Sequence, residues 1–218
     1  MVNEPRSPAA EAYRTLRVNI QFASPDKPLK TILATSTSPE EGKSTTIANL
    51  AIALAETGAP TLLVDCDLRR PSLHTLFGLP NEAGLTSLML AGTDLAAGSL
   101  PLQATGVENL RLLTSGPLPP NPAELLASRR MSELLVLLAE QATYVLIDTP
   151  PIIAVADAAV PAARVDGVLL VVRAGKTRRD LALKARKMLD HVKANVVGVI
   201  ITDARLEGSA YEYYGKQG

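Results

Sequence analysis

The sequence has little cysteine, few aromatic residues and no long hydrophobic run, and each shortage excludes a class of protein. Its 218 residues include one cysteine, Cys66, no tryptophan and only 3% aromatic residues. A single cysteine cannot form an internal disulfide, which fits a reducing compartment. The apolar runs are far shorter than the roughly 18–20 residues that a membrane-spanning helix needs, and the first residues lack the apolar core of a signal peptide. We therefore expect a soluble, cytoplasmic chain that is not exported.

The sequence also lacks an excess of charge of either sign. Lys plus Arg and Asp plus Glu both number 22, so the formal net charge is zero. This balance argues against a generally basic nucleic-acid-binding protein, and we expect no nucleic-acid partner. With 47% hydrophobic residues the chain is expected to fold, and its length suits one α/β domain.

Apolar runs of strand length alternate with helical patterns along the chain. The pattern predicts helices over residues 7–22, 43–56, 123–141 and 178–192, short helical pieces in 72–97, and strands over 29–35, 61–65, 110–114, 144–148, 167–173 and 196–202. Continuous apolar strands are typical of a parallel sheet covered on both faces. The fold class is therefore α/β, a doubly wound and mostly parallel sheet with helices on both faces. We divide the chain into an N-terminal helix and connector (1–28), a main domain (29–205) and a flexible tail rich in tyrosine (206–218).

The first predicted strand leads into a phosphate-binding loop. Its residues are Thr37-Ser38-Pro39-Glu40-Glu41-Gly42-Lys43-Ser44-Thr45, and a helix follows, which is the context that a P-loop requires. Backbone N–H groups of such a loop bind phosphates, the lysine reaches the β- and γ-phosphates, and the serine hydroxyl binds Mg²⁺. Thr37 departs from the general pattern, which has its first glycine there. The predicted nucleotide-binding residues of the loop are Pro39, Glu40, Glu41, Gly42, Lys43, Ser44 and Thr45.

Carboxylates follow two other predicted strands. Asp65 and Asp67 end the strand over 61–65, and Asp148 ends the strand over 144–148. Carboxyl ends of neighbouring parallel strands face one crevice, where carboxylates can hold Mg²⁺ and accept a proton from an attacking hydroxyl. Loop acids paired with a neighbouring arginine, Arg69 or Arg70, are the alternative for the first two. We therefore expect Lys43, Ser44, Asp65, Asp67 and Asp148 to share one site, in which Ser44 and the carboxylates can hold Mg²⁺.

Several of these motifs resemble the bacterial tyrosine kinases (BY-kinases) that control capsule and exopolysaccharide export. Asp65-Cys66-Asp67-Leu68-Arg69 resembles the family's extra Walker A′ motif, and residues 119–126 resemble a segment that follows it. Glu11, Arg14 and Arg17 match its E-x-x-R-x-x-R oligomerisation motif. The end of the chain, Tyr211-Glu212-Tyr213-Tyr214, resembles its tyrosine cluster. The resemblance covers nearly the whole chain and implies the P-loop NTPase fold.

This resemblance also implies an activity and its partners. The expected activity is an ATP- and Mg²⁺-dependent protein-tyrosine kinase that modifies Tyr211, Tyr213 and Tyr214 of a neighbouring copy and regulates polysaccharide polymerisation and export. Through the matching positions, the resemblance implies a catalytic group of Lys43, Asp65, Asp67 and Asp148 and the metal ligands Ser44, Asp67 and Asp148. Within this group Asp65 is the candidate for activating the tyrosine hydroxyl, although spacing leaves open which Asp is the base. The implied partners are a ring-like homo-oligomer, in which Glu11, Arg14 and Arg17 make contacts, a tyrosine phosphatase and an activator. That activator is the cytoplasmic tail of a membrane polysaccharide copolymerase, separate or fused, which would bring the chain to the inner face of the membrane.

Other residues keep alternatives open. Glu40 stands where many relatives have glycine, which motivates a weakly active scaffold of the copolymerase as one alternative function. A MinD/ParA-like positioning ATPase is another, but Ser38 stands where those ATPases have a signature lysine. Asp203 lies where related ATPases often place an adenine-reading Asn, so we predict that it accepts a hydrogen bond from the adenine amino group. The helix over 178–192 is rich in Arg and Lys, and we favour a solvated face over a patch for a membrane surface or partner.

Overall fold

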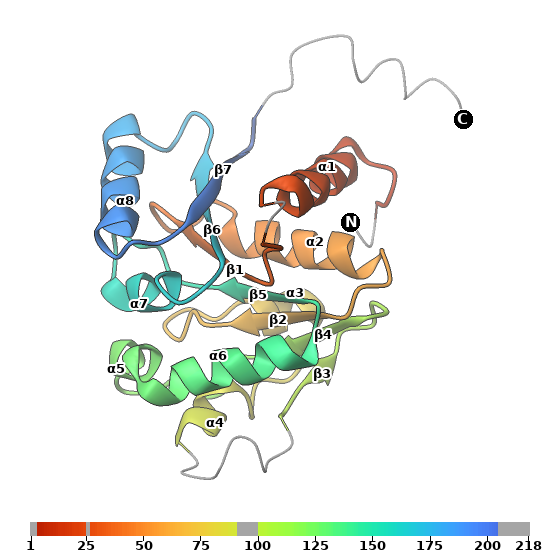
Figure 1. Cartoon of the computed structure of the whole chain (residues 1–218), viewed down its shortest axis with the longest axis vertical. Coiled ribbons are helices and arrows are strands. Elements are labelled where there is room, and N and C mark those ends of the chain that lie inside the picture. The colour runs from red at the N-terminus through yellow and green to blue at the C-terminus, as the bar shows by residue number, and fades with distance from the viewer. Residues whose placement is uncertain (1–3, 25–26, 91–99, 205–218) are drawn as a thin grey trace.

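The computed structural model describes residues 4–24, 27–90 and 100–204. Within these residues, seven strands form one sheet in the order β3-β4-β2-β5-β1-β6-β7 (Figure 1). All neighbouring strands pair in parallel except β3, which is antiparallel to β4. The predicted α/β class with a mostly parallel sheet is confirmed. The strands are β1 (Thr31–Ser36), β2 (Thr61–Asp65), β3 (Gln103–Ala104), β4 (Leu110–Leu113), β5 (Tyr144–Asp148), β6 (Gly167–Arg173) and β7 (Val196–Thr202).

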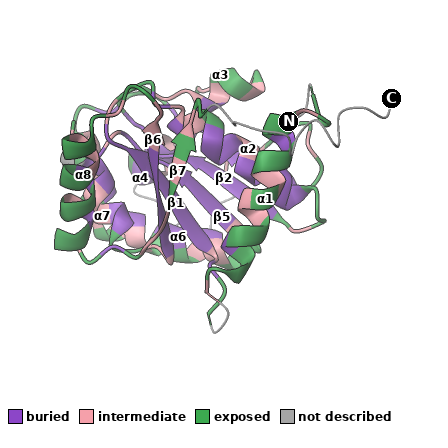
Figure 2. Cartoon of the chain, turned by 90° about the horizontal axis from the view of Figure 1, so that it is seen from above, coloured by how far each residue is buried: buried purple, intermediate pink, exposed green. Residues whose placement is uncertain are grey.

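Helices cover both faces of this sheet. One face carries α1 (Pro8–Phe22), α2 (Lys43–Ala55) and α3 (Leu73–Phe77), and the other carries α4 (Leu85–Leu90), α5 (Pro122–Ala127), α6 (Arg129–Gln141), α7 (Ala159–Ala162) and α8 (Arg179–His191). A 3₁₀ turn, η1 (Ala156–Ala158), precedes α7. Successive strand residues face opposite layers, since Ile32 packs in the core beneath α2 and Leu33 in the core beneath α6. Figure 2 shows the buried strands between helices whose outer sides are exposed.

The first helix begins where its cap predicts. The Ser7 side chain accepts a hydrogen bond from the Ala10 N–H at 3.2 Å, and Pro8 occupies the first turn. The helix packs on the outer side of α2, and the Arg17 guanidinium donates to the Ala53 carbonyl at 3.0 Å. The Ala53 carbonyl lies in the last turn of α2, where carbonyl groups have no N–H partner within the helix. The bond from Arg17 gives this carbonyl a hydrogen-bond donor.

The predicted helix over 123–141 is wrong in one respect, because the structure has two helices there. Ser128 separates α5 from α6 with an extended backbone, ψ 158°. Its hydroxyl accepts from the Met131 N–H at 3.2 Å and donates to the Leu125 carbonyl at 2.7 Å. A serine that caps a new helix in this way satisfies one of the N–H groups that the turn would leave without a partner. The short edge strand β3 was not predicted either.

Two further expectations concern the ends of the chain and the membrane. Tyr211, Tyr213 and Tyr214, with the rest of the predicted tail, lie outside the described residues. The division into residues 1–28, 29–205 and 206–218 therefore stays a prediction. In the part that is described, no helix is both long and apolar enough to cross a membrane.

Candidate nucleotide and phosphoryl-transfer site

The phosphate-binding loop connects the carboxyl end of β1 to the amino end of α2. Gly42 has φ 84° and is the N-cap of α2, which carries no side-chain cap. A Cβ atom on Gly42 would lie 3.2 Å from the Thr202 methyl group, so both the backbone conformation and the space favour glycine. The uncapped N–H groups at the start of α2 suit an anionic ligand. Glu40 also has a left-handed backbone, φ 62°, but its side chain is exposed.

The buried carboxylate of Glu41 holds this loop in shape. It accepts hydrogen bonds from the Thr37 N–H at 2.8 Å, the Thr37 hydroxyl at 2.6 Å and the Ser38 N–H at 3.0 Å. It also accepts from the Thr177 hydroxyl, 2.5 Å away, in the turn between β6 and α8. The Glu41 side chain is thus occupied inside the protein, so a nucleotide would meet only its main chain. The hydroxyl of Thr37 fills a structural role at the place where the general pattern has glycine.

Lys43, Ser44 and Asp148 form a buried cluster at the base of the loop. The Lys43 ammonium donates to Asp148 Oδ1 at 2.5 Å and to Ser44 Oγ at 3.0 Å. The Ser44 hydroxyl donates to Asp148 Oδ2 at 2.6 Å. Burial raises the pKa of Asp148, and the positive charge of Lys43 opposes that rise. The structure therefore brings Asp148 next to Lys43 and Ser44, which lie 105 and 104 residues earlier in the sequence. From the sequence, all three residues are predicted to share one site.

Asp67 joins this cluster from the next strand of the sheet. Its Oδ2 lies 3.8 Å from the Lys43 ammonium, and its Oδ1 accepts from the Arg70 N–H at 3.0 Å. Asp67 also lines the cavity above the loop, so its carboxylate faces a space where a substrate can bind.

Asp65 lies deeper than Asp67 and does not line that cavity. One of its oxygens accepts from the Ser72 and Leu73 N–H groups at 3.1 and 3.0 Å, and the other accepts from the Asp67 N–H at 3.2 Å. Burial, and then the negative charge of Asp148, raise the pKa of Asp65 to about 7. These contacts fix the loop between β2 and α3, and they give Asp65 a structural task whether or not it takes part in chemistry.

The cavity above the loop has a volume of about 550 Å³. Its walls come from the phosphate loop, the residues after β2 and the residues after β5: Ser36, Pro39, Glu40, Glu41, Gly42, Lys43, Ser44, Thr45, Asp67, Arg69, Arg70, Ser72, Pro150, Pro151, Ala154 and Val155. All seven predicted loop residues, Glu41 included, are thus present in one wall. The cavity lies at the carboxyl ends of parallel strands, where open α/β sheets bind their ligands.

The ion-pair partner of Arg69 is not one of the two acids that the sequence analysis considered. Its guanidinium binds Asp157 with two hydrogen bonds, of 2.7 and 3.1 Å, rather than Asp65 or Asp67. The Asp157 carboxylate is almost fully buried, so this pair anchors the Arg69 wall of the cavity to the segment before α7. Sequence reasoning missed this partner because it lies 88 residues away and no local spacing marks it.

The donor atoms at the base of the cavity fit Mg²⁺ better than a softer metal. Ser44 Oγ, Asp148 and Asp67 supply only oxygen, which is the donor that Mg²⁺ prefers. The described residues contain no cluster of three or more His, Cys, Asp or Glu that would by itself hold a metal. Mg²⁺ is commonly bound by one or two carboxylates together with substrate phosphates, so the side chains present match a nucleotide-dependent site.

Asp203 is linked to the phosphate loop through Arg173 and is not among the residues that line the cavity. Arg173 binds the Asp203 carboxylate at 2.5 Å and donates to the Glu40 carbonyl at 3.1 Å. The Thr202 hydroxyl donates to the Glu41 carbonyl at 2.7 Å. These contacts connect the end of β7 to the loop. The adenine contact of Asp203 stays a prediction.

The predicted oligomer residues make contacts within the chain. Arg14 pairs with Glu11 and donates to the Pro5 carbonyl at 2.9 Å, while Arg17 binds Ala53 as described above. Glu11 remains exposed. An additional role between copies stays a prediction.

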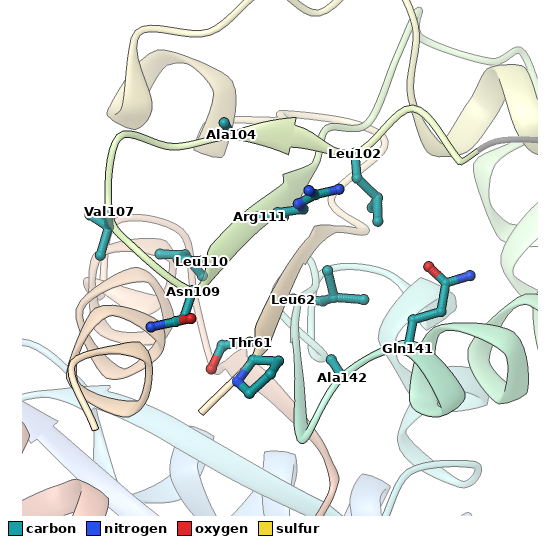
Figure 3. Close-up of a pocket in the computed structure, with 11 residues that line it drawn as sticks. Thr61, Leu62, Leu102, Ala104, Val107, Asn109, Leu110, Arg111, Gln141 and Ala142 are labelled. Carbon is teal, nitrogen blue, oxygen red and sulfur yellow. The ribbon is translucent and has the colours of Figure 1, made fainter. Parts of the chain in front are cut away.

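A second cavity, of about 420 Å³, lies at the opposite end of the sheet. Figure 3 shows it between the β3–β4 hairpin, the start of β2 and the end of α6, with Leu62, Leu102, Arg111 and Gln141 among the residues that line it. It faces the amino ends of β2 and β4, so it is separate from the phosphate loop. We assign no ligand to it.

A loop of this geometry between strand and helix, with a buried Lys–Ser–Asp cluster at the sheet's carboxyl edge, defines a P-loop NTPase. A family model for ParA, described as "NUBPL iron-transfer P-loop NTPase", matches residues 29–206. The tyrosine-protein kinase YwqD of Bacillus subtilis is 46% identical over 98% of this chain and 90% of its own length. The kinase domain of the Escherichia coli tyrosine kinase ETK has a TM-score of 0.86 and 32% identity, over 95% of this chain and 82% of that one. The chain belongs to the bacterial tyrosine kinases, which confirms the resemblance drawn from its motifs.

A more distant structure shares the fold alone. The septum site-determining protein MinD from Pyrococcus horikoshii, in complex with Mg-ADP, has a TM-score of 0.66 and 23% identity over 79% of this chain and 69% of that one.

Proposed function

We propose that the chain is an ATP- and Mg²⁺-dependent autokinase that phosphorylates Tyr211, Tyr213 and Tyr214 of a neighbouring copy. The observation that supports this most is the cavity in which Lys43, Ser44 and Asp67 meet beside the uncapped start of α2. The same chain carries three of its five tyrosines in its last eight residues. A phosphate-binding site and a set of acceptor hydroxyls are thus present in one sequence.

In this proposal the side chains position and neutralise charge. The start of α2 and the Lys43 ammonium hold the phosphates of ATP, and Ser44, Asp67 and Asp148 provide oxygen ligands for the metal. Bound Mg²⁺ would offset the negative charge of the phosphate oxygens during transfer. The tyrosine oxygen bonds to the γ-phosphorus while the bond from that phosphorus to the bridging oxygen breaks, which leaves ADP.

We assign the phenolic proton to Asp67 rather than to Asp65. Asp67 faces the cavity, whereas both oxygens of Asp65 accept main-chain hydrogen bonds away from it. A phenol with a pKa of about 10 needs a nearby carboxylate and positive charge to react at neutral pH. Asp65 then acts as a positioning residue, because it holds the main chain of Asp67.

The proposed setting follows from the family. We propose that the kinase works as a ring-like homo-oligomer, that the cytoplasmic tail of a membrane polysaccharide copolymerase activates it at the inner face of the membrane, and that a tyrosine phosphatase reverses its action. Through these partners it would regulate capsular or exopolysaccharide polymerisation and export. The Glu40 side chain is exposed, and the residue lines the cavity beside the phosphate loop. A weakly active scaffold therefore stays an alternative that the ATP affinity of Glu40→Gly would test.

The test is phosphopeptide mass spectrometry with two chains that differ in mass. Unlabelled wild type is mixed with ¹⁵N-labelled Lys43→Met protein, ATP and Mg²⁺, with and without the copolymerase tail. We expect phosphate on the labelled tryptic peptide of residues 206–216, because the labelled chain cannot transfer phosphate itself. Labelled protein incubated alone is the control and should stay unmodified. ATP hydrolysis without phosphate on either peptide, in the presence of the copolymerase tail, would favour a positioning ATPase and overturn the proposal.

A further inference from the structure

Positive charge is concentrated on the surface formed by α8 and its flanking turns. Residues 176–193 contain seven Lys or Arg and two Asp, although the chain as a whole has no net charge. The rest of the chain therefore carries an excess of five negative charges. All seven cationic side chains of this stretch are exposed. We call them the basic surface: Lys176, Arg178, Arg179, Lys184, Arg186, Lys187 and Lys193.

Most of this charge has no counter-charge on the protein. Arg178 pairs with Asp180 at 2.9 Å, and Arg186 pairs with Asp190 at 2.9 Å. Among residues 4–24, 27–90 and 100–204, no acidic side chain pairs with the other five members of the basic surface. The N-cap of α8 is Arg178, which makes no side-chain cap, so the helix begins with N–H groups that also favour an anion.

The described chain ends beside the turn that leads from β6 to α8. The Ala174 N–H donates to the Thr202 carbonyl at 2.9 Å, and Arg173 binds Asp203. Both contacts join the end of β7 to the turn that leads from β6 into α8. The described chain then ends at Ala204, one residue after Asp203 (Figure 1).

The chain between Ala204 and the tyrosines can extend over a length comparable to that of α8. Tyr211 lies seven residues beyond Ala204 and Tyr214 ten residues beyond it. An extended chain spans at most about 3.3–3.6 Å per residue, so these tyrosines can lie up to about 25 and 35 Å from Ala204. The 13 residues of α8 extend over about 20 Å.

Phosphorylation changes the charge of the tail by about the amount that the basic surface carries. Residues 205–218 contain two basic and two acidic side chains, so the unmodified tail has little attraction for cations. Each phosphotyrosine adds about −1.5 to −2 charges and three strong acceptor oxygens. Three of them add about −5 to −6, against a net charge of +5 for residues 176–193.

We propose that the basic surface is a phosphotyrosine-binding site that holds the phosphorylated form of the chain's own residues 205–218. Arg and Lys bind phosphate through charge-assisted hydrogen bonds, which the unmodified tyrosines cannot form. The proposal rests on the proposed function, since it requires phosphate on these tyrosines. A tail bound to the basic surface is not available to the active sites of neighbouring copies. Phosphorylation would therefore remove the tail from the pool of substrates.

The side chains of α8 favour the phosphorylated tail over an anionic lipid surface as the ligand. Helices that lie on membranes combine a basic face with several apolar side chains that enter the lipid. On α8, Leu183 is the large apolar residue that stands out as exposed among the described residues, at 53%. A single leucine provides little anchoring, whereas phosphate groups need only the cations.

A binding experiment with synthetic peptides tests the site without relying on kinase activity. Peptides of residues 206–218 carry a fluorophore and either three phosphotyrosines or three tyrosines. They are added to the full-length protein without ATP, and binding is measured by fluorescence anisotropy. We expect the phosphorylated peptide to bind at least about tenfold more tightly at low salt, and to weaken as ionic strength rises. Equal affinity of the two peptides would overturn the proposal, whatever the mass spectrometry of autophosphorylation shows.

Charge-reversed variants locate the site. The triple variant Arg179→Glu, Lys184→Glu, Lys187→Glu should lose the preference for the phosphorylated peptide. The milder pair Lys184→Gln and Lys187→Gln, which introduces no repulsion, should lose part of it and guards against misfolding of the triple variant. Arg129→Glu is the matched control, because Arg129 is 93% exposed on α6. Undiminished binding to both α8 variants would place the peptide elsewhere and overturn the proposal.

Vesicles of phosphatidylserine and phosphatidylcholine form the last arm. If the wild type binds these vesicles through the residues changed in the triple variant, but does not distinguish the two peptides, the surface belongs to a lipid and the proposal is wrong. Preference for the phosphorylated peptide, lost in the triple variant and kept in Arg129→Glu, supports it.

Discussion

The carboxylate of Glu41 determines the shape of the phosphate loop through four hydrogen bonds. Replacing it with glutamine leaves one acceptor oxygen and places an NH₂ group where N–H and O–H donors converge. We expect Glu41→Gln to lower the free energy of unfolding by about 1–3 kcal/mol and to weaken nucleotide binding. Urea denaturation and calorimetric titration with ATP measure the two effects. Glu40→Gln, at the exposed neighbouring position, is the control and should change stability by less than about 0.5 kcal/mol. Equal effects of the two substitutions would show that the Glu41 contacts matter little.

The buried carboxylate of Asp65 should make stability depend on pH. Its pKa is about 7 in the folded protein, compared with an ordinary value of 3.8. Between these values the folded chain holds a proton that the unfolded chain has lost, so the free energy of unfolding falls as pH rises from about 4 to about 7. We expect Asp65→Asn to reduce this fall, and Asp148, whose pKa is also raised, to account for the remainder. Urea denaturation at pH 5 and pH 8 without nucleotide measures the fall in the free energy of unfolding. Asp190→Asn, on the exposed side of α8, should retain the wild-type fall, and an unchanged fall in Asp65→Asn would contradict the assignment.

At the residue scale, the sequence predicts the residues of the catalytic cluster better than the residues that hold the phosphate loop in place. Lys43, Ser44 and Asp148 each follow or end a strand, so local pattern and parallel pairing are enough to assign them to one edge of the sheet. Thr177, which binds Glu41, has no such signal, because it is a common residue in a turn far along the chain. Spacing also could not separate the roles of Asp65 and Asp67. Only the direction of each carboxylate distinguishes them.

Among the elements, the break between α5 and α6 shows how a single hydroxyl changes a helix. The apolar pattern is helical on both sides of Ser128, so periodicity alone predicts one helix. We expect Ser128→Ala to lower the free energy of unfolding by about 1 kcal/mol, because the cap of α6 is lost, and to leave nucleotide binding unchanged. Urea denaturation measures the change, and Ser132→Ala, one turn into α6, is the control. A stability no lower than that of the control would mean that the cap is dispensable.

The long strands were easier to predict than the short elements. Four predicted strands, 61–65, 144–148, 167–173 and 196–202, have the observed bounds, because each is a continuous apolar run that ends where polar residues begin. The strand β3 has two residues and depends on pairing with β4, so it leaves no pattern of its own. Elements whose stability comes from tertiary contacts are the ones that the sequence does not reveal.

For the whole molecule, α1 carries the residues predicted to make contacts between copies. Arg17 donates a hydrogen bond to Ala53 within the chain, whereas the Glu11 side chain is exposed. Substitutions of these two residues can therefore distinguish an effect on folding from an effect on contacts between copies. We expect Arg17→Ala to lower the free energy of unfolding by about 1 kcal/mol through loss of its bond to Ala53. Glu11→Ala should leave stability unchanged and, in the proposed oligomer, reduce the assembled mass measured by light scattering. An assembly unaltered by Glu11→Ala and by Arg14→Ala with Arg17→Ala would remove this helix from the interface.

The order of strands in the sheet has a consequence for synthesis of the protein. The phosphate loop follows β1, which the ribosome makes early, but β1 lies between β5 and β6, which come more than a hundred residues later. The outer side of the loop rests on Arg173, at the end of β6, and on Thr177 and Thr202, which are made later still. Contacts between segments so distant in sequence form late in folding. The nascent chain therefore cannot complete its nucleotide site until nearly all of the domain has emerged, and a ribosome-bound fragment that ends before β7 would be unable to act as a kinase.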